Sequence, residues 1–230
     1  MDQVYGQAEN VAAFLGLASE HSVVGMSVLG FLVDISAPLE DAPWLRHLDE
    51  TIKLGIVDIF LRDWFWRIWT IREAALAKKM TITCGSQHIS WNFDHGTLSQ
   101  MLFRIKSSAL SPEWQSSHAT QLRSLDWSPF PNILEMQLRT VALEKKIVIE
   151  KNLLDIAFDF QHRHSTDPRD KYYAIFGLAD KSEGRRFFIQ PDYSLSLESV
   201  HNQFITEIAR LHGILGGPHQ STGAAGPFAA

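Results

Sequence analysis

Hydrophobic and polar positions follow several periods along the chain, and each period predicts a different kind of element. Apolar and β-branched runs predict strands at 11–15 and 80–84, the second returning as a hairpin through Gly85-Ser86-Gln87. Apolar residues at spacings of three and four predict helices, at 2–10, 22–35, 44–61, 63–77, 97–105, 133–160 (with a break near 150–152), 168–176 and 196–211. The segment 107–132 lacks a period and predicts a long loop.

The order of these elements indicates the fold class. Strands mix with helices in the first 90 residues, and helices make up most of the chain after residue 90. We therefore expect an α/β fold for about the first 90 residues and a mostly α-helical extension over 91–212, so that the chain is helix-dominated overall. Residues 213–230 are rich in Gly, Ala, Ser and Pro and are expected to form a disordered tail.

Composition narrows the function classes. The 230 residues carry a net charge of −5, which argues against general nucleic-acid binding because that needs a basic face. The lone cysteine, Cys84, excludes an internal disulfide and fits a reducing compartment. The apolar run Val23–Val33 is too short to span a bilayer, and the N-terminus has no basic signal region. We expect a cytoplasmic protein without a membrane span.

The segment 63–77 has an unusual aromatic content. Trp64, Trp66 and Trp69 fall close together, with arginines and a glutamate between them, and a basic turn follows at 78–79. One continuous helix would place six residues on one wide face: Phe65, Ile68, Trp69, Ile71, Arg72 and Leu76. Glu73 would follow Trp69 by one turn, with its carboxylate against the indole. We expect this helix to be either a buried spine or the wall of a site.

The same run resembles the hallmark of the fungal heterokaryon incompatibility (HET) domain, which reads roughly Arg-x-Trp-Phe-x-Arg-x-Trp-x-x-Gln-Glu. The matching residues are Arg62, Trp64, Phe65, Arg67, Trp69 and Glu73, while Arg72 stands where the family usually has Gln. Further segments are similar to family signatures in the family's order: 1–16, 84–91, 165–179 with Asp167, Pro168, Arg169 and Asp170, and 190–194 with Asp192 and Tyr193.

The resemblance implies a fold and a role. It implies that residues 1–90 are the C-terminal part of a TIR-like HET domain and that 91–212 are a helical HET-associated region. It implies fungal nonself recognition, in which such domains trigger programmed cell death after activation by a protein partner or by self-association. The family's opening strands are not in the chain, so we expect an N-terminally truncated member. A degenerate, inactive fragment is an alternative.

Glu73 is the candidate catalytic residue. HET domains have been suggested to be distant relatives of TIR domains, some of which cleave NAD with a helix-borne glutamate four residues after a tryptophan. Trp69 and Glu73 have this spacing. On this hypothesis the protein is an NAD(P) glycohydrolase, with Trp69 stacking on the substrate and Arg67 and Arg72 holding its phosphates. Alternatively, Glu73 pairs with an arginine inside the core and the arginines stack on indoles.

The residues leave open whether the protein is an enzyme, and they indicate no cofactor; NAD enters only as a candidate substrate. The downstream motif residues are expected to be mainly structural, as a capped helix start and a turn: Asp167, Pro168, Arg169, Asp170, Asp192 and Tyr193. His162-x-His164 with Asp167 lacks a fourth ligand at a diagnostic spacing, so we expect no metal site. Cys84 is expected to be a buried structural thiol.

Overall fold

The structure, a computed structural model, describes residues 5, 7–47, 49–92, 94–110, 129–145, 153–179 and 190–211. Its strands are β1 (Val11–Phe14), β2 (Lys79–Cys84) and β3 (Gln87–Asn92). Its helices are α2 (Ser22–Val33), α3 (Asp49–Phe60), α4 (Asp63–Trp66), α5 (Ile68–Leu76), α6 (His95–Leu110), α9 (Pro129–Glu144), α10 (Leu153–Phe160), α11 (Asp170–Ala179) and α12 (Leu197–Leu211). Helices thus dominate the described residues around one small sheet, which confirms the expected fold class.

The sheet has the order β1-β2-β3, with β1 parallel and β3 antiparallel to β2. The register places Ala13 beside Ile82 and Ile82 beside Ile89 on the covered face. Gly85 makes the hairpin turn with a φ of 56°, a conformation that glycine adopts without strain. Both strand segments and the hairpin expected from the sequence are confirmed.

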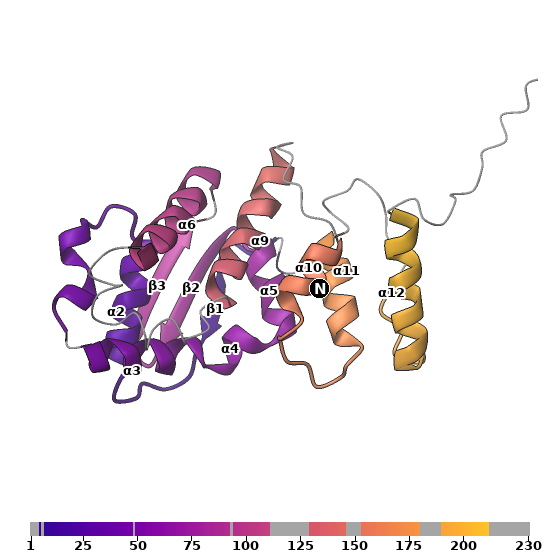
Figure 1. Ribbon diagram of the computed structural model, residues 1–230, viewed down its shortest axis with the longest axis horizontal. Helices are drawn as coiled ribbons and strands as arrows, with labels where there is room; N and C mark the ends of the chain where they lie inside the picture. Colours follow the sequence, from indigo (N-terminus) through magenta and orange to yellow (C-terminus); the bar gives the residue numbers. More distant parts are fainter. Residues whose placement is uncertain are drawn as a thin grey trace, which may run out of the picture.

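One face of the sheet carries the first hydrophobic cluster, which is built with α2, α3, α6 and α9 (Figure 1). Helices α2 and α3 meet backbone to backbone at Gly25 and Gly55: a Cβ added to Gly25 would lie 2.1 Å from the Gly55 carbonyl oxygen. Only glycine permits such an approach.

The second hydrophobic cluster joins α5, α9, α10, α11 and α12 (Figure 1). Helix α5 belongs to both clusters, because Ala74 packs in the first while Ile71 and Ala75 pack in the second. The division into residues 1–90 and 91–212 therefore stays a prediction, since α5 and α9 contribute to both clusters. The segment 213–230 lies outside the described residues.

Several helix boundaries differ from the sequence-based expectation. The helix expected over 44–61 begins at Asp49, after a separate 3₁₀ turn at Pro43–Leu45. The expected loop 107–132 is helical at both ends, where α6 reaches Leu110 and α9 begins at Pro129; 111–128 lie outside the described residues. Prolines in the first turn of a helix lose no intrahelical hydrogen bond, so Pro129 and Pro131 do not prevent α9 from starting there. Of the expected helix 2–10, only Tyr5 and Gln7 are described as helical.

Candidate functional site

The expected continuous helix over 63–77 is wrong, because Arg67 is extended (φ −77°, ψ 136°) and separates α4 from α5. The Ile68 N–H donates to the His164 carbonyl at 2.9 Å, and the His164 N–H donates to the Trp66 carbonyl at 2.6 Å. The Thr70 hydroxyl donates to the Trp64 carbonyl at 2.8 Å, the acceptor that a continuous helix would offer to Ile68. Side-chain and long-range partners thus replace the helical bonds.

This break also overturns the expected single apolar face. Phe65 on α4 is fully buried in the first cluster, whereas Ile68 and Ile71 on α5 are buried in the second. Trp64 lies edge-on to Phe65, with ring centroids 5.1 Å apart, and packs against the first cluster. The tryptophan segment therefore contributes fully buried residues to both clusters, while Trp64, Trp66 and Trp69 themselves are only partly buried. The expected basic C-terminal turn is absent from α5, which ends at Leu76.

A pocket of about 470 Å³ opens where Arg67 meets the segment around His164. It is lined by Asp63, Arg67, Ile68, Trp69, His164, Ser165, Thr166 and Asp170. The structure thus brings together Arg67 and Trp69, two of the predicted substrate-binding residues, with Asp170 from the downstream motif. Its volume falls within the range of ligand pockets.

Glu73, the candidate catalytic residue, is half-buried on α5 and is not among the residues that line this pocket. Its carboxylate accepts a hydrogen bond from the Tyr5 hydroxyl at 3.1 Å. Partial burial raises the pKa of Tyr5, the nearby Glu73 carboxylate raises it further, and the Arg67 guanidinium acts in the opposite direction. In this structure Glu73 therefore links α5 to the segment before β1 through a hydrogen bond with Tyr5.

Arg72 lies between α5 and α11. Its guanidinium carbon is 5.9 Å from the centre of the Trp69 ring, at cation–π distance. A Cβ added to Gly177 would lie 2.4 Å from the same carbon atom. The helix expected to end at 176 continues past Gly177 to Ala179, and the missing side chain of this glycine makes room for Arg72. A phosphate-binding role for Arg72 stays a prediction.

The two downstream motifs form one network around Arg169. The guanidinium donates to both Asp167 carboxylate oxygens, the nearest at 2.6 Å, and to the carbonyls of Tyr193 and Leu195 at 2.8 and 2.7 Å. The hydrogen bonds from Arg169 hold the pKa of Asp167 below its ordinary value. Pro168 lies in the turn between these partners, and α11 begins only at Asp170.

Tyrosines complete this network from both sides. The Tyr193 hydroxyl donates to Asp170 at 2.6 Å, and the Tyr173 hydroxyl donates to the Asp192 carbonyl at 2.7 Å. The Asp192 carboxylate accepts from Ser194, and these bonds lower its pKa. The structural roles expected for both motifs are consistent with these contacts. Tyr173 was not identified from the sequence as a member of this network.

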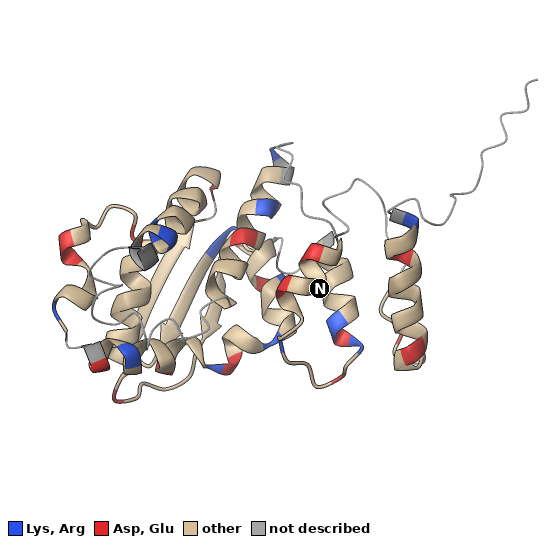
Figure 2. Cartoon of the chain, in the orientation of Figure 1, with Lys and Arg blue, Asp and Glu red and all other residues tan. Residues whose placement is uncertain are grey.

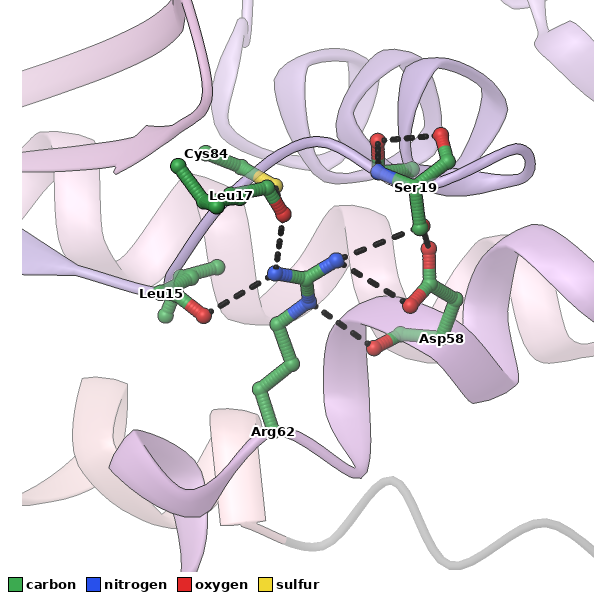
Figure 3. Close-up of polar contacts among 7 residues, drawn as sticks. Leu15, Leu17, Ser19, Asp58, Arg62 and Cys84 are labelled. Atoms are coloured by element: carbon green, nitrogen blue, oxygen red, sulfur yellow. Dashed lines mark hydrogen bonds and ion pairs between the residues drawn. The ribbon is translucent and has the colours of Figure 1, made fainter.

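A second arginine centre, around Arg62, was not identified from the sequence as a site. Figure 3 shows its guanidinium between the backbone carbonyls of Leu15 and Leu17 and the Asp58 carboxylate, at distances of 3.0, 2.8 and 3.1 Å. These bonds hold the loop that leaves β1 through Gly16, whose φ is 107°. The signal in the sequence was the pair Asp58 and Arg62, spaced four residues apart at the end of a predicted helix.

The described residues contain no cluster of three or more side chains able to hold a metal ion. His164 lines the pocket beside Arg67, and Cys84 is fully buried in β2. None of the helices in the described part of the chain has the length and apolarity that crossing a bilayer requires. Figure 2 shows basic and acidic residues interspersed along the described helices and loops.

The chain is similar to heterokaryon incompatibility protein 6, OR allele, of Neurospora crassa. The two are 24% identical over 247 aligned positions, which cover 91% of this chain and 35% of that protein. The chain therefore spans about a third of the length of this relative. No protein-family model and no solved structure matches the chain. The similarity agrees with the resemblance carried by the tryptophan segment and the downstream motifs.

Proposed function

We propose that this protein acts in fungal nonself recognition, as a HET-type module that promotes cell death when a partner or self-association activates it. The observation that carries the proposal is the similarity to a heterokaryon incompatibility protein over 91% of the chain. Because the chain spans only about a third of that protein, the activity of the whole relative comes to this chain as a proposal.

The geometry supports an interaction module more than an enzyme. The residues that carry the resemblance lie where elements meet. Phe65 and Trp64 pack in the first cluster, and Arg67 separates α4 from α5. Arg169 connects the start of α11 to the turn before α12. A signalling role requires that a change in one cluster displace the other, and we propose that these residues carry that change.

Expression in a fungal host tests the proposal. The chain should impair growth when it is fused to a domain that forces oligomerisation, and Trp69→Ala with Arg67→Ala should relieve the effect. Both positions lie at the pocket and are not fully buried, so the fold should survive. A matched control is Thr166→Ala, at the exposed rim of the same pocket. Normal growth of the host despite forced oligomerisation at full expression would refute the proposal.

NAD(P) glycohydrolysis centred on Glu73 is a second candidate function. It is favoured by one observation: Arg67 and Trp69 line the same pocket, so a guanidinium and an indole are available together for a phosphate and a planar ring. Glu73 follows Trp69 by one helical turn, and its carboxylate would have to leave Tyr5 to reach a substrate.

Nicotinamide release from NAD measures this second candidate. Activity should vanish in Glu73→Gln, which keeps the shape and can still accept from Tyr5. Tyr5→Phe is the control, because it frees the Glu73 carboxylate without removing it and should retain or raise activity. Equal nicotinamide release by the unchanged chain and by Glu73→Gln would exclude Glu73 as the catalytic group.

A further inference from the structure

The pocket beside Arg67 is lined by charges of both signs. Arg67 lies between α4 and α5, while Asp63 begins α4 and Asp170 begins α11. Among the described residues, no ion pair joins the Arg67 guanidinium to either carboxylate. The Asp170 carboxylate accepts a hydrogen bond from the Tyr193 hydroxyl through one of its two oxygens. The pocket therefore offers a cation and two anions that do not neutralise one another by direct contact.

Two further features of the pocket favour a ligand with hydrogen-bonding atoms of its own. Ser165 is a lining residue, and its buried hydroxyl oxygen has no hydrogen-bond partner among the residues that the structure describes. A buried hydroxyl without a partner is unfavourable, so a bound polar group that reaches it would stabilise the complex. The pocket also lies at the N-terminal end of α5, where no side chain caps the helix and the helix dipole favours a negative group.

Trp69 and Ile68 give the pocket an apolar wall. Trp69 supplies a partly exposed indole, and Ile68 supplies a buried aliphatic side chain behind it. The face of an indole attracts an ammonium group as well as apolar groups. The volume of about 470 Å³ suits a small molecule rather than a chain segment. The lining is therefore complementary to a small ligand that carries a carboxylate, an ammonium group and an apolar side group.

We propose that this pocket binds a free L-α-amino acid with an apolar or aromatic side chain. The ligand carboxylate pairs with Arg67 at the end of α5. Its ammonium group pairs with Asp63 and Asp170, and its side chain contacts Trp69. An α-amino acid carries both charges on one carbon atom, so one small molecule satisfies both kinds of group. The phosphates of a dinucleotide would instead meet two carboxylates of the same sign.

Isothermal titration calorimetry on the full 230-residue chain tests the proposal, with L-phenylalanine as the probe. Two analogues each remove one charge: N-acetyl-L-phenylalanine keeps the carboxylate, and L-phenylalaninamide keeps the ammonium group. Each analogue should bind at least about tenfold more weakly than L-phenylalanine, because one set of charged groups in the pocket loses its partner. L-Glutamate should also bind weakly, because its second carboxylate meets Asp63 and Asp170. These comparisons use the unchanged chain, so they do not depend on the folding of a variant.

Substitutions in the pocket assign the two charges of the ligand. Arg67→Gln should weaken L-phenylalanine and N-acetyl-L-phenylalanine by about tenfold and should leave L-phenylalaninamide unaffected. Asp63→Asn should weaken L-phenylalanine and L-phenylalaninamide instead. Both residues are exposed, and Arg67 pairs with His164 through its backbone, so the circular dichroism spectrum should not change. Arg46→Gln is the matched control, because it removes the same charge from an exposed arginine outside the pocket lining and should bind L-phenylalanine normally.

Several results would overturn the proposal. One is the absence of binding at L-phenylalanine concentrations of about 10 mM. Another is equal affinity for L-phenylalanine and either analogue, or an affinity that Arg67→Gln leaves unchanged, since one of the two charges would then be unused. Tighter binding of AMP or NAD than of L-phenylalanine would mean that the pocket is a nucleotide site. Neither the growth of a fungal host nor the release of nicotinamide enters these measurements, so this proposal and the proposed functions can fail separately.

Discussion

The two hydrophobic clusters are held together by different kinds of contact. In the first cluster, backbone meets backbone, because Gly25 of α2 touches the Gly55 carbonyl of α3. In the second cluster, side chains meet: the Phe204 ring of α12 lies with its centroid 5.2 Å from that of Phe176, and Gly177 of α11 faces the Arg72 guanidinium. Backbone contacts cannot relax when atoms are added, whereas side chains can adopt another rotamer. Replacing a glycine by alanine at a close contact should therefore lower the free energy of unfolding more in the first cluster than in the second.

Near each cluster, one arginine binds the backbone carbonyls of a loop or turn. Arg62 binds two carbonyls of the loop after β1, and Arg169 binds two carbonyls of the turn before α12. The Arg62 side chain is 14% exposed and takes its carboxylate partner from one helical turn earlier, whereas the Arg169 side chain is 23% exposed and takes its partner from a turn. The better-buried arginine should matter more for stability.

Gly25→Ala should have the largest effect. The new Cβ would lie 2.1 Å from the Gly55 carbonyl oxygen, so α2 and α3 would have to separate. Overpacking of this kind costs about 3 kcal/mol of the free energy of unfolding. Urea denaturation followed by circular dichroism measures it.

Gly30→Ala is the matched control on the same helix. A Cβ at Gly30 would meet only Ile89, at 3.6 Å, which is ordinary contact. The helix propensity gained by replacing glycine should stabilise the protein by about 0.5–1 kcal/mol. Similar losses for both variants would show that the backbone contact between α2 and α3 is not what limits packing there.

Arg62→Met should have the next largest effect. Methionine keeps the apolar stem but leaves two loop carbonyls and the Asp58 carboxylate without their donor, at a cost of about 2–4 kcal/mol. Thermal unfolding should show a clear drop in Tm. The double variant with Asp58→Asn should recover part of the loss, because the uncompensated carboxylate is gone. The Arg169→Met variant should lose less stability than Arg62→Met, and the reverse order would contradict the comparison of the two arginines.

The stability that Tyr193 contributes near the second cluster should depend on pH. Partial burial, followed by the hydrogen bond to Asp170, raises its pKa from 10.0 to about 12. A raised folded-state pKa means that the neutral phenol stabilises the fold: its contribution is complete below pH 10 and is lost as pH rises through about 12. As the pH rises from 10 to about 12, the Tyr193→Phe variant should lose less stability than the unchanged chain. If the free energies of unfolding of the variant and the unchanged chain fall equally with pH in alkaline buffers, the Tyr193–Asp170 hydrogen bond does not stabilise the fold.

The sequence predicted the elements that depend on local pattern and missed those that depend on distant partners. The strands, the hairpin and most helices follow from apolar spacing and glycine turns. The break at Arg67 did not, because its cause is the pairing with His164, nearly a hundred residues away in the chain. Glu73 follows Trp69 by one turn of the unbroken helix α5 yet is not among the residues that line the pocket, because the rest of the lining comes from the distant segment around His164.

Gly177→Ala should have the smallest effect, although its geometry resembles that of Gly25→Ala. The new Cβ would lie 2.4 Å from the Arg72 guanidinium carbon, which is the far end of a flexible side chain. The arginine should move, give up its contact with Trp69, and offset a gain of about 0.5–1 kcal/mol in helix propensity. The net change should stay within about 1 kcal/mol.

The double variant Gly177→Ala with Arg72→Gln separates the two contributions. The shorter glutamine, which is also the residue that the HET signature carries at this position, leaves room for the Cβ, so the glycine replacement should then be stabilising. Urea denaturation of the four proteins in this cycle gives the coupling between the two positions. A loss for Gly177→Ala as large as that for Gly25→Ala would mean that side chains in the second cluster are as immobile as the backbone in the first, and the contrast between the halves would fail.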